Sequence, residues 1–279
     1  MSSTIEKTFD VSSPARLDLS NIRGSVRILA GEDGSIRVSA VKDTTRGDPQ
    51  RTEIELVQQA DGTVKAATRF PDAPFGWLIG SFPCPVDYEV TAPRQCSLKV
   101  RGVSNSALAE GFEGEFTFQS VSGDVNLRQL VGPVKIQMVS GNVDLKEVDG
   151  ELRLNTVSGK VSGERLSGPL HVETVSGRIE LDQSSISSVE ASAVSAGLDL
   201  ETALAEGPYR FNSVSGEVTL KVPEETHCSA ELRTVSGNLR IGLPATTQSR
   251  GHGAQTAEVQ GGGVKVYLGS VSGDLSIQK

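Results

Sequence analysis

The tripeptide Val-Ser-Gly recurs along this chain and constrains its fold more than any other feature. The copies stand eighteen residues apart in the middle of the sequence and at looser intervals after residue 200. Self-similarity at a fixed period predicts a repeat architecture, in which one supersecondary unit stacks on the next. The copies begin at Val121, Val139, Val157, Val175, Val214, Val235 and Val271.

A finer period of nine residues runs through the same region. Between Val103 and Val175 every ninth residue is apolar, and from Val121 onward a glycine follows two positions later, with apolar residues at four and six. Side chains alternate along an extended chain, so positions 0, +4 and +6 are expected to share the inward face with the glycine. In this frame the valine of Val-Ser-Gly points inward and the serine faces water.

These periods predict an all-β chain folded as a single-stranded parallel β-helix, or β-solenoid. Two nine-residue arms would form one coil of about eighteen residues, with like residues stacked at about 4.8 Å. One arm buries only about three apolar side chains, at roughly 1.5 to 3 kcal/mol each. A single arm therefore cannot fold alone, and only a stack of several coils is stable.

We predict two regions along the chain. Residues 1–92 are expected to form an N-terminal region of β-strands that caps the repeat, and 93–279 the β-solenoid repeat region with an irregular excursion at 244–263. Within the first region, 70–85 forms an aromatic loop that holds the only tryptophan and four prolines. This loop is interpreted either as a cap over the first coil or as an exposed apolar contact for a partner or a membrane surface.

The formal net charge of −8 argues against a nucleic-acid groove, because phosphates are bound by clustered Lys and Arg. No apolar run approaches the roughly 18 residues that a membrane span requires, and residues 1–10 lack the apolar core of a secretory signal. As written, the chain is expected to be cytoplasmic and without an integral membrane segment. Peripheral association with the cell envelope is a second expectation.

Three cysteines, Cys84, Cys96 and Cys228, make an odd count without the spacing of a metal site. A disulfide between Cys84 and Cys96 and a set of reduced, half-buried thiols are both open at this stage, and we favour the thiols.

The chain offers no assembled catalytic set. A serine nucleophile needs a base within hydrogen-bond reach, and the three histidines fall at unrelated positions of the repeat. The glycines are too sparse for a calcium-binding nonapeptide roll. We therefore predict that the protein is not an enzyme and has no catalytic, cofactor-binding or metal-binding residue.

Two kinds of interaction surface follow from the repeat. The ends of a β stack display unpaired backbone groups, which predicts contact with a protein partner or self-association through the solenoid ends. An alternative is a glycan-binding or polysaccharide-acting face on the outward ladders. The residues proposed for the first surface are Phe75, Trp77, Phe82, Leu275 and Ile277, and those for the glycan face are Asp124, Asp144, Lys160 and Arg178.

Three blocks in a fixed order give the chain a family resemblance: residues 17–28, residues 86–93 and the Val-Ser-Gly-Asp-like rungs. They resemble the bacterial β-strand-repeat proteins known as putative adhesins of unknown function. The resemblance implies a β-solenoid related to the head domain of putative autotransporter adhesins, and it supplies no catalytic residue. The function expected from all of these features is a non-enzymatic β-solenoid scaffold or adhesin-like interaction protein.

Overall fold

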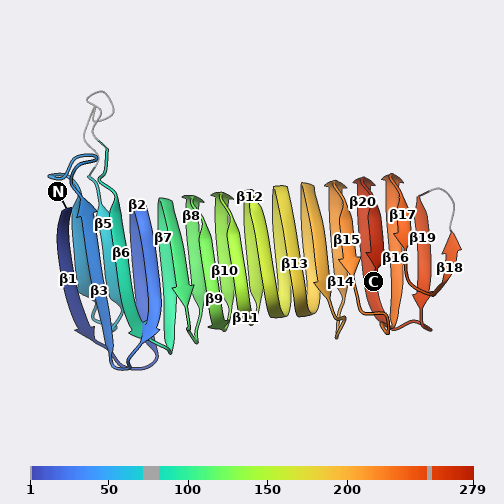
Figure 1. Cartoon of the computed structure of the whole chain (residues 1–279), viewed down its shortest axis with the longest axis horizontal. Helices are drawn as coiled ribbons and strands as arrows, with labels where there is room; N and C mark the ends of the chain where they lie inside the picture. The colour runs from blue at the N-terminus through green and yellow to red at the C-terminus, as the bar shows by residue number, and fades with distance from the viewer. Residues whose placement is uncertain (1, 72–81, 250–252) are drawn as a thin grey trace. The chain divides into compact units, whose positions relative to one another are not determined.

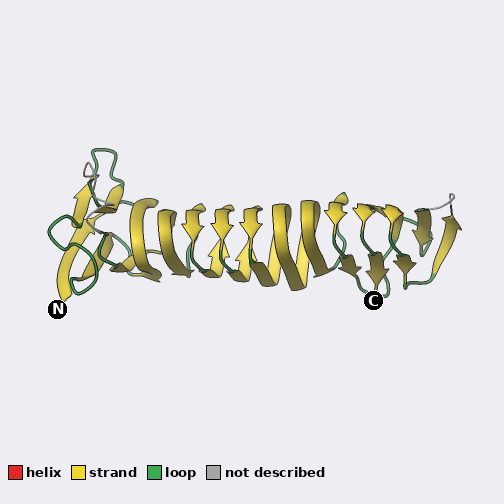
Figure 2. Ribbon diagram, turned by 90° about the horizontal axis from the view of Figure 1, so that it is seen from above, coloured by secondary structure: helices red, strands yellow, loops and turns green. Residues whose placement is uncertain are grey.

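The computed structural model describes residues 2–71, 82–249 and 253–279. Within these ranges all of the regular secondary structure is β-strand, which confirms the all-β class (Figure 2). The chain divides into two units, one of residues 1–133 and 137–139 and one of residues 134–136 and 140–279. β10 (Val134–Ser140) contributes residues to both.

Within its described residues the first unit holds nine complete strands, and the outermost of these are antiparallel. β2 pairs in parallel with β5, β6 and β7. The antiparallel pairs are β1 with β3, β3 with β6, and β4 with β5. The strands are β1 (Ser2–Asp10), β2 (Ala15–Gly31), β3 (Ser35–Asp43), β4 (Glu53–Gln58), β5 (Val64–Arg69), β6 (Val86–Pro93), β7 (Cys96–Glu110), β8 (Phe116–Ser122) and β9 (Val125–Val131).

The pairing of β2 with β7 joins residues on both sides of the expected boundary at 92. Ala15 pairs with Cys96, and the ladder continues to Leu29 and Glu110. β7 in turn pairs with β8 and β9 at an offset of eighteen residues, as in Leu98 to Phe116. Residues before and after position 92 therefore belong to one sheet, while the division into 1–92 and 93–279 stays a prediction.

The second unit continues the same register. β11 pairs with β13 so that Val143 lies beside Val161, again eighteen residues apart. Its strands are β11 (Val143–Asp149), β12 (Leu152–Ser158), β13 (Lys160–Thr202), β14 (Tyr209–Ser215), β15 (Val218–Lys221), β16 (Cys228–Ser236), β17 (Leu239–Ile241), β18 (Ala245–Ser249), β19 (Ala254–Val259), β20 (Val264–Ser272) and β21 (Leu275–Gln278).

The last two strands do not end the stack, contrary to the sequence-based expectation. β20 pairs with β14 on one side and β16 on the other, and β21 lies in the same way between β15 and β17 (Figure 1). Leu275 and Ile277 are consequently fully buried. The expectation that these two residues form an uncapped terminal rung is wrong, because coils earlier in the sequence occupy both sides.

The region expected to be an irregular excursion contains a pair of strands. β19 is antiparallel to β16, and β18 is antiparallel to β19. Ala257 and Val259 point inward and are buried. The alternation was hard to recognise in the sequence because alanine and threonine occupy most of the positions that a strand usually fills with larger residues.

The valine of Val-Ser-Gly points outward, which corrects the nine-residue frame. In β8 the buried residues are Phe116, Phe118 and Ser120, so alternation places Val121 on the outer side. The same holds for the copies at Val139, Val157 and Val175, each about half exposed. The serine that follows is only half-buried and not fully in water.

The two arms of a coil differ because one of them contains a left-handed residue. In β9, Val125 and Leu127 point inward, Gln129 has a φ of 52°, and Leu130 is buried again. The extra residue shifts the alternation by one, so the apolar residue nine positions after Val121 is buried whereas Val121 is not. The true repeat is therefore eighteen residues, and nine is only an approximate half.

Glycine is required where the chain bends after Val-Ser-Gly. Gly159 has a φ of +132°, and a Cβ on it would lie 1.9 Å from the carbonyl oxygen of Gly141 in the neighbouring coil. Only glycine avoids both the strained backbone conformation and this collision.

We expect Gly159→Ala to lower the free energy of unfolding by more than about 2 kcal/mol, because strain and backbone overlap act together. Gly261→Ala is the matched control, since Gly261 also has a positive φ but its Cβ would meet nothing within 4 Å. Urea unfolding followed by circular dichroism measures both. Equal losses in the two variants would show that contact between coils contributes nothing at this bend.

The inserted position of β21 predicts the effect of trimming its side chains. Leu275→Ala should cost about 2 to 5 kcal/mol, as for a fully buried leucine. Val271→Ala, at a half-exposed site, should cost less than about 1 kcal/mol. The same unfolding measurement compares them, and a small loss at Leu275 would indicate that β21 is a frayed edge.

The three cysteines are free and buried, which settles the alternative in favour of thiols. Burial raises the pKa of Cys96 to about 12 and that of Cys228 to about 11. Since the thiolate is the reactive form, a thiol reagent such as Ellman's should not label the folded protein at pH 8 and should label three thiols in denaturant. Rapid labelling of the native protein would contradict the buried positions.

Candidate functional site

A groove lies on the outer face of five neighbouring strands in the second unit. Their order across the sheet is β14, β20, β16, β19, β18. The groove has a volume of about 840 Å³, whereas three other hollows on the described residues measure about 380 to 450 Å³. Buried residues such as Tyr209, Val266 and Ala230 point into the core beneath it, so alternation directs their neighbours outward.

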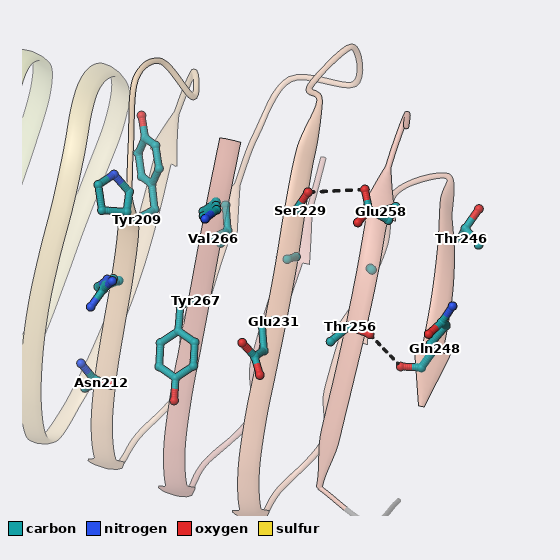
Figure 3. Close-up of a pocket in the computed structure, with 15 residues that line it drawn as sticks. Tyr209, Asn212, Ser229, Glu231, Thr246, Gln248, Thr256, Glu258, Val266 and Tyr267 are labelled. Atoms are coloured by element: carbon teal, nitrogen blue, oxygen red, sulfur yellow. Dashed lines mark hydrogen bonds between the residues drawn. The ribbon is translucent and has the colours of Figure 1, made fainter. Parts of the chain in front are cut away.

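One row of side chains crosses all five strands. Tyr267 on β20 pairs with Arg210 on β14 and with Glu231 on β16. Glu231 pairs with Thr256 on β19, which pairs with Gln248 on β18. Figure 3 shows Tyr267, Glu231, Thr256 and Gln248 on successive strands along this row.

Tyr267 lies along the sheet face and does not stand away from it. A Cβ placed on Gly269 would be 3.1 Å from Cε1 of Tyr267, 3.3 Å from its hydroxyl oxygen and 3.3 Å from Oδ1 of Asn212. The missing side chain at Gly269 therefore makes room for the ring, and Asn212 lies at its edge. An aromatic ring held flat in this way offers a ligand an apolar surface with a polar hydroxyl at one end.

Polar groups of both charges surround the ring. Arg210 and Lys265 are cationic, and Glu231 and Glu258 are anionic. Glu231 accepts a hydrogen bond from Nε of Arg233 at 2.6 Å, and Ser229 donates to Glu258 at 3.4 Å. The groove is thus balanced in charge and rich in hydrogen-bonding groups, a combination suited to a polar ligand without a strong net charge.

The glycan face predicted from the sequence is not this groove. Lys160 contacts Glu180 at 2.5 Å and Arg178 contacts it at 3.7 Å, and the hydrogen bond from Lys160 holds the pKa of Glu180 below its usual value. Asp144 accepts a hydrogen bond from Ser162 at 3.4 Å. These three residues lie in the second unit and Asp124 in the first, and the glycan face of all four residues stays a prediction.

The aromatic interaction residues are described only in part. Phe82 is 59% exposed, consistent with an accessible position, whereas Phe75 and Trp77 lie outside the described residues. Their role as contacts stays a prediction.

Sequence reasoning missed the groove residues because they come from strands whose order in space differs from their order in the chain. The sequence held one weak signal. At the position of Gly269 the neighbouring strands carry a full side chain, whereas this strand has a glycine two residues after Tyr267.

Among the residues described, no cluster of three or more His, Cys, Asp or Glu side chains is placed to hold a metal ion. Likewise, the described part of the chain contains no helix that could cross a membrane.

Two solved structures from one organism are similar to this chain. A putative adhesin from Parabacteroides distasonis is 16% identical, with a TM-score of 0.51, over 99% of this chain and 97% of its own. A putative lipid binding protein from the same organism is 13% identical, with a TM-score of 0.49, over 98% of this chain and 96% of its own. At 16% identity the likeness to the putative adhesin concerns the fold alone.

No curated protein matches the chain. Residues 15–278 match the family described as Toastrack DUF4097, which covers the predicted repeat and most of the region before it. The chain belongs to the Toastrack DUF4097 family.

Proposed function

We propose that the protein is a non-enzymatic, adhesin-like binding scaffold that holds a short glycan in the groove across β14, β20, β16, β19 and β18. The observation that carries the proposal is the flat ring of Tyr267 within the polar row that spans the five strands. The scaffold in this proposal is a single-stranded stack of coils of about eighteen residues, supported by registers such as that of Val143 with Val161.

The chemistry of a sugar suits this set of groups. One face of a pyranose ring is made of C–H groups, which pack on an aromatic ring. Its hydroxyls both donate and accept, so they can pair with amides, hydroxyls and ionised groups together. Asn212, Gln248 and Thr256 provide such neutral partners, and Arg210 and Glu231 provide charge-assisted ones.

Other ligand classes fit the groove less well. A peptide that binds by strand addition needs a free strand edge, but the floor here is a sheet face in which β20, β16 and β19 are each paired on both sides. A nucleic acid needs an excess of cations, whereas this lining holds two basic and two acidic side chains. A lipid chain needs an apolar lining, and most of the outward side chains here are polar.

Removal of the aromatic surface tests the proposal. A glycan array identifies the bound sugar, and titration calorimetry then compares variants. Tyr267→Ala should weaken binding by about fivefold or more, because stacking of this kind contributes on the order of 1 kcal/mol beyond the polar contacts. Gly269→Val should weaken it as well, since the added side chain displaces the ring.

Asp144→Asn is the control, because Asp144 belongs to the face predicted from the sequence and not to the groove. Loss of binding in Asp144→Asn with none in Tyr267→Ala would overturn the assignment of the site. Absence of any array signal would overturn the glycan proposal, and release of shortened sugars during incubation would contradict the non-enzymatic role.

A further inference from the structure

The exposed valines of the second unit form a continuous ladder at one corner of the coils. Five of them are between 44% and 51% exposed and the sixth, Val235, is 82% exposed. Registers give most of their order: Thr156 pairs with Thr174, Ala193 with Ser213, and Ser272 with both Ser215 and Ser236. A Cβ on Gly197 would lie 3.9 Å from the Arg178 side chain, which places the coil of Val194 beside that of Val175. From one end to the other the ladder is Val157, Val175, Val194, Val214, Val271 and Val235.

The spacing of the ladder narrows the choice of partner. Its valines repeat at the distance between paired strands, about 4.8 Å. Only another stacked β ladder carries apolar side chains at this repeat over many coils, and a second copy of the same chain supplies one. The exposed apolar area, on the order of 400 Å², is of the size of the largest patches on monomeric proteins, which are often functional.

A ladder of charges runs beside the valines and changes sign along its length. Lys160 stands three residues after Val157, and Arg178 stands three residues after Val175. The residue three positions after Val194 is Gly197. Further along stand Glu217 and Asp274, and all four charged residues are exposed. The backbone contacts of Leu198 with Glu217 and of Val218 with Asp274 confirm that these positions lie in neighbouring coils.

The basic end keeps a positive charge and the acidic end a negative one. Lys160 and Arg178 share one carboxylate, that of Glu180. At the other end Asp274 accepts hydrogen bonds from Asn238, and Glu217 accepts one from Thr219. Among the residues described, neither Glu217 nor Asp274 forms an ion pair within the chain, so both carboxylates are left to attract an external cation.

This pattern is complementary to itself under a two-fold rotation. If two ladders face each other and run in opposite directions, with the axis near Val194, then Lys160 faces Asp274 and Arg178 faces Glu217. Each pair occurs twice, as in any two-fold symmetric interface. Gly197 faces its own copy at the centre and has no side chain of its own, while the guanidinium of Arg178 lies 3.9 Å from where its Cβ would be.

We propose that the protein forms an antiparallel two-fold dimer through the valine ladder of its second unit, with Val194 close to the axis. The apolar ladder supplies the packing, and the flanking charges set the direction and the register. The apolar area per partner is below the roughly 800 Å² of a standard stable interface, so we expect a weak dimer that dissociates on dilution. The dimer needs no glycan, and its existence is independent of the groove.

Charge reversal tests the direction of the pairing. Sedimentation velocity over about 1 to 200 µM should show the full chain moving from monomer to dimer. Arg178→Glu and Glu217→Arg should each raise the dissociation constant at least about tenfold, and the double variant should restore it. Val175→Thr, which keeps the shape of the side chain, should also weaken the dimer while leaving the melting temperature unchanged.

Single cysteines locate the axis, because the three native thiols are buried. Val194→Cys should form a disulfide with its own copy under mild oxidation, and Val157→Cys should not. A mixture of Val157→Cys with Val271→Cys should cross-link. A strict monomer at every concentration, no rescue by the double charge reversal, or equal self-linking by Val157→Cys and Val194→Cys would each overturn the proposal.

Discussion

The close approach of neighbouring coils at the glycine bend is the constraint on which the rest of the structure depends. The carbonyl oxygen of Gly141 lies where a Cβ of Gly159 would be, and the same relation links Gly177 to Gly159. This contact lets each arm meet its equivalent in hydrogen-bond register, so like residues stack on like residues. Because an isolated arm buries too little to fold, stability belongs to the stack and not to any single coil.

Stacking restricts which residues can occupy the inward positions much more than it restricts the outward positions. Inward positions must fit the residue above and below, so apolar side chains such as Val143 and Val161 recur there. Outward positions carry no such restriction, and a row can hold a different side chain on every strand. The groove row from Arg210 to Gln248 is an example, since five strands contribute five unlike side chains to one surface.

The sequence predicted the all-β class and the eighteen-residue register because both follow directly from spacing. It misled about the direction of Val121, since a nine-residue frame assumes that both arms alternate alike, and the left-handed Gln129 breaks that symmetry. The position of Leu275 could not be predicted either. Its neighbours, Val218 and Leu239, lie 57 and 36 residues earlier and not one repeat away, and the repeat does not encode which coil is inserted between which. The groove depends on this insertion and was missed for the same reason.

The insertion also affects how the second unit is assembled during synthesis. Coils up to β15 can join the stack one after another as they leave the ribosome, each on the one made before. β16 and β17 cannot do so, because the places beside β14 and β15 belong to β20 and β21, which are translated later. The groove floor therefore forms only after residues 264–278 have taken their place in the sheet.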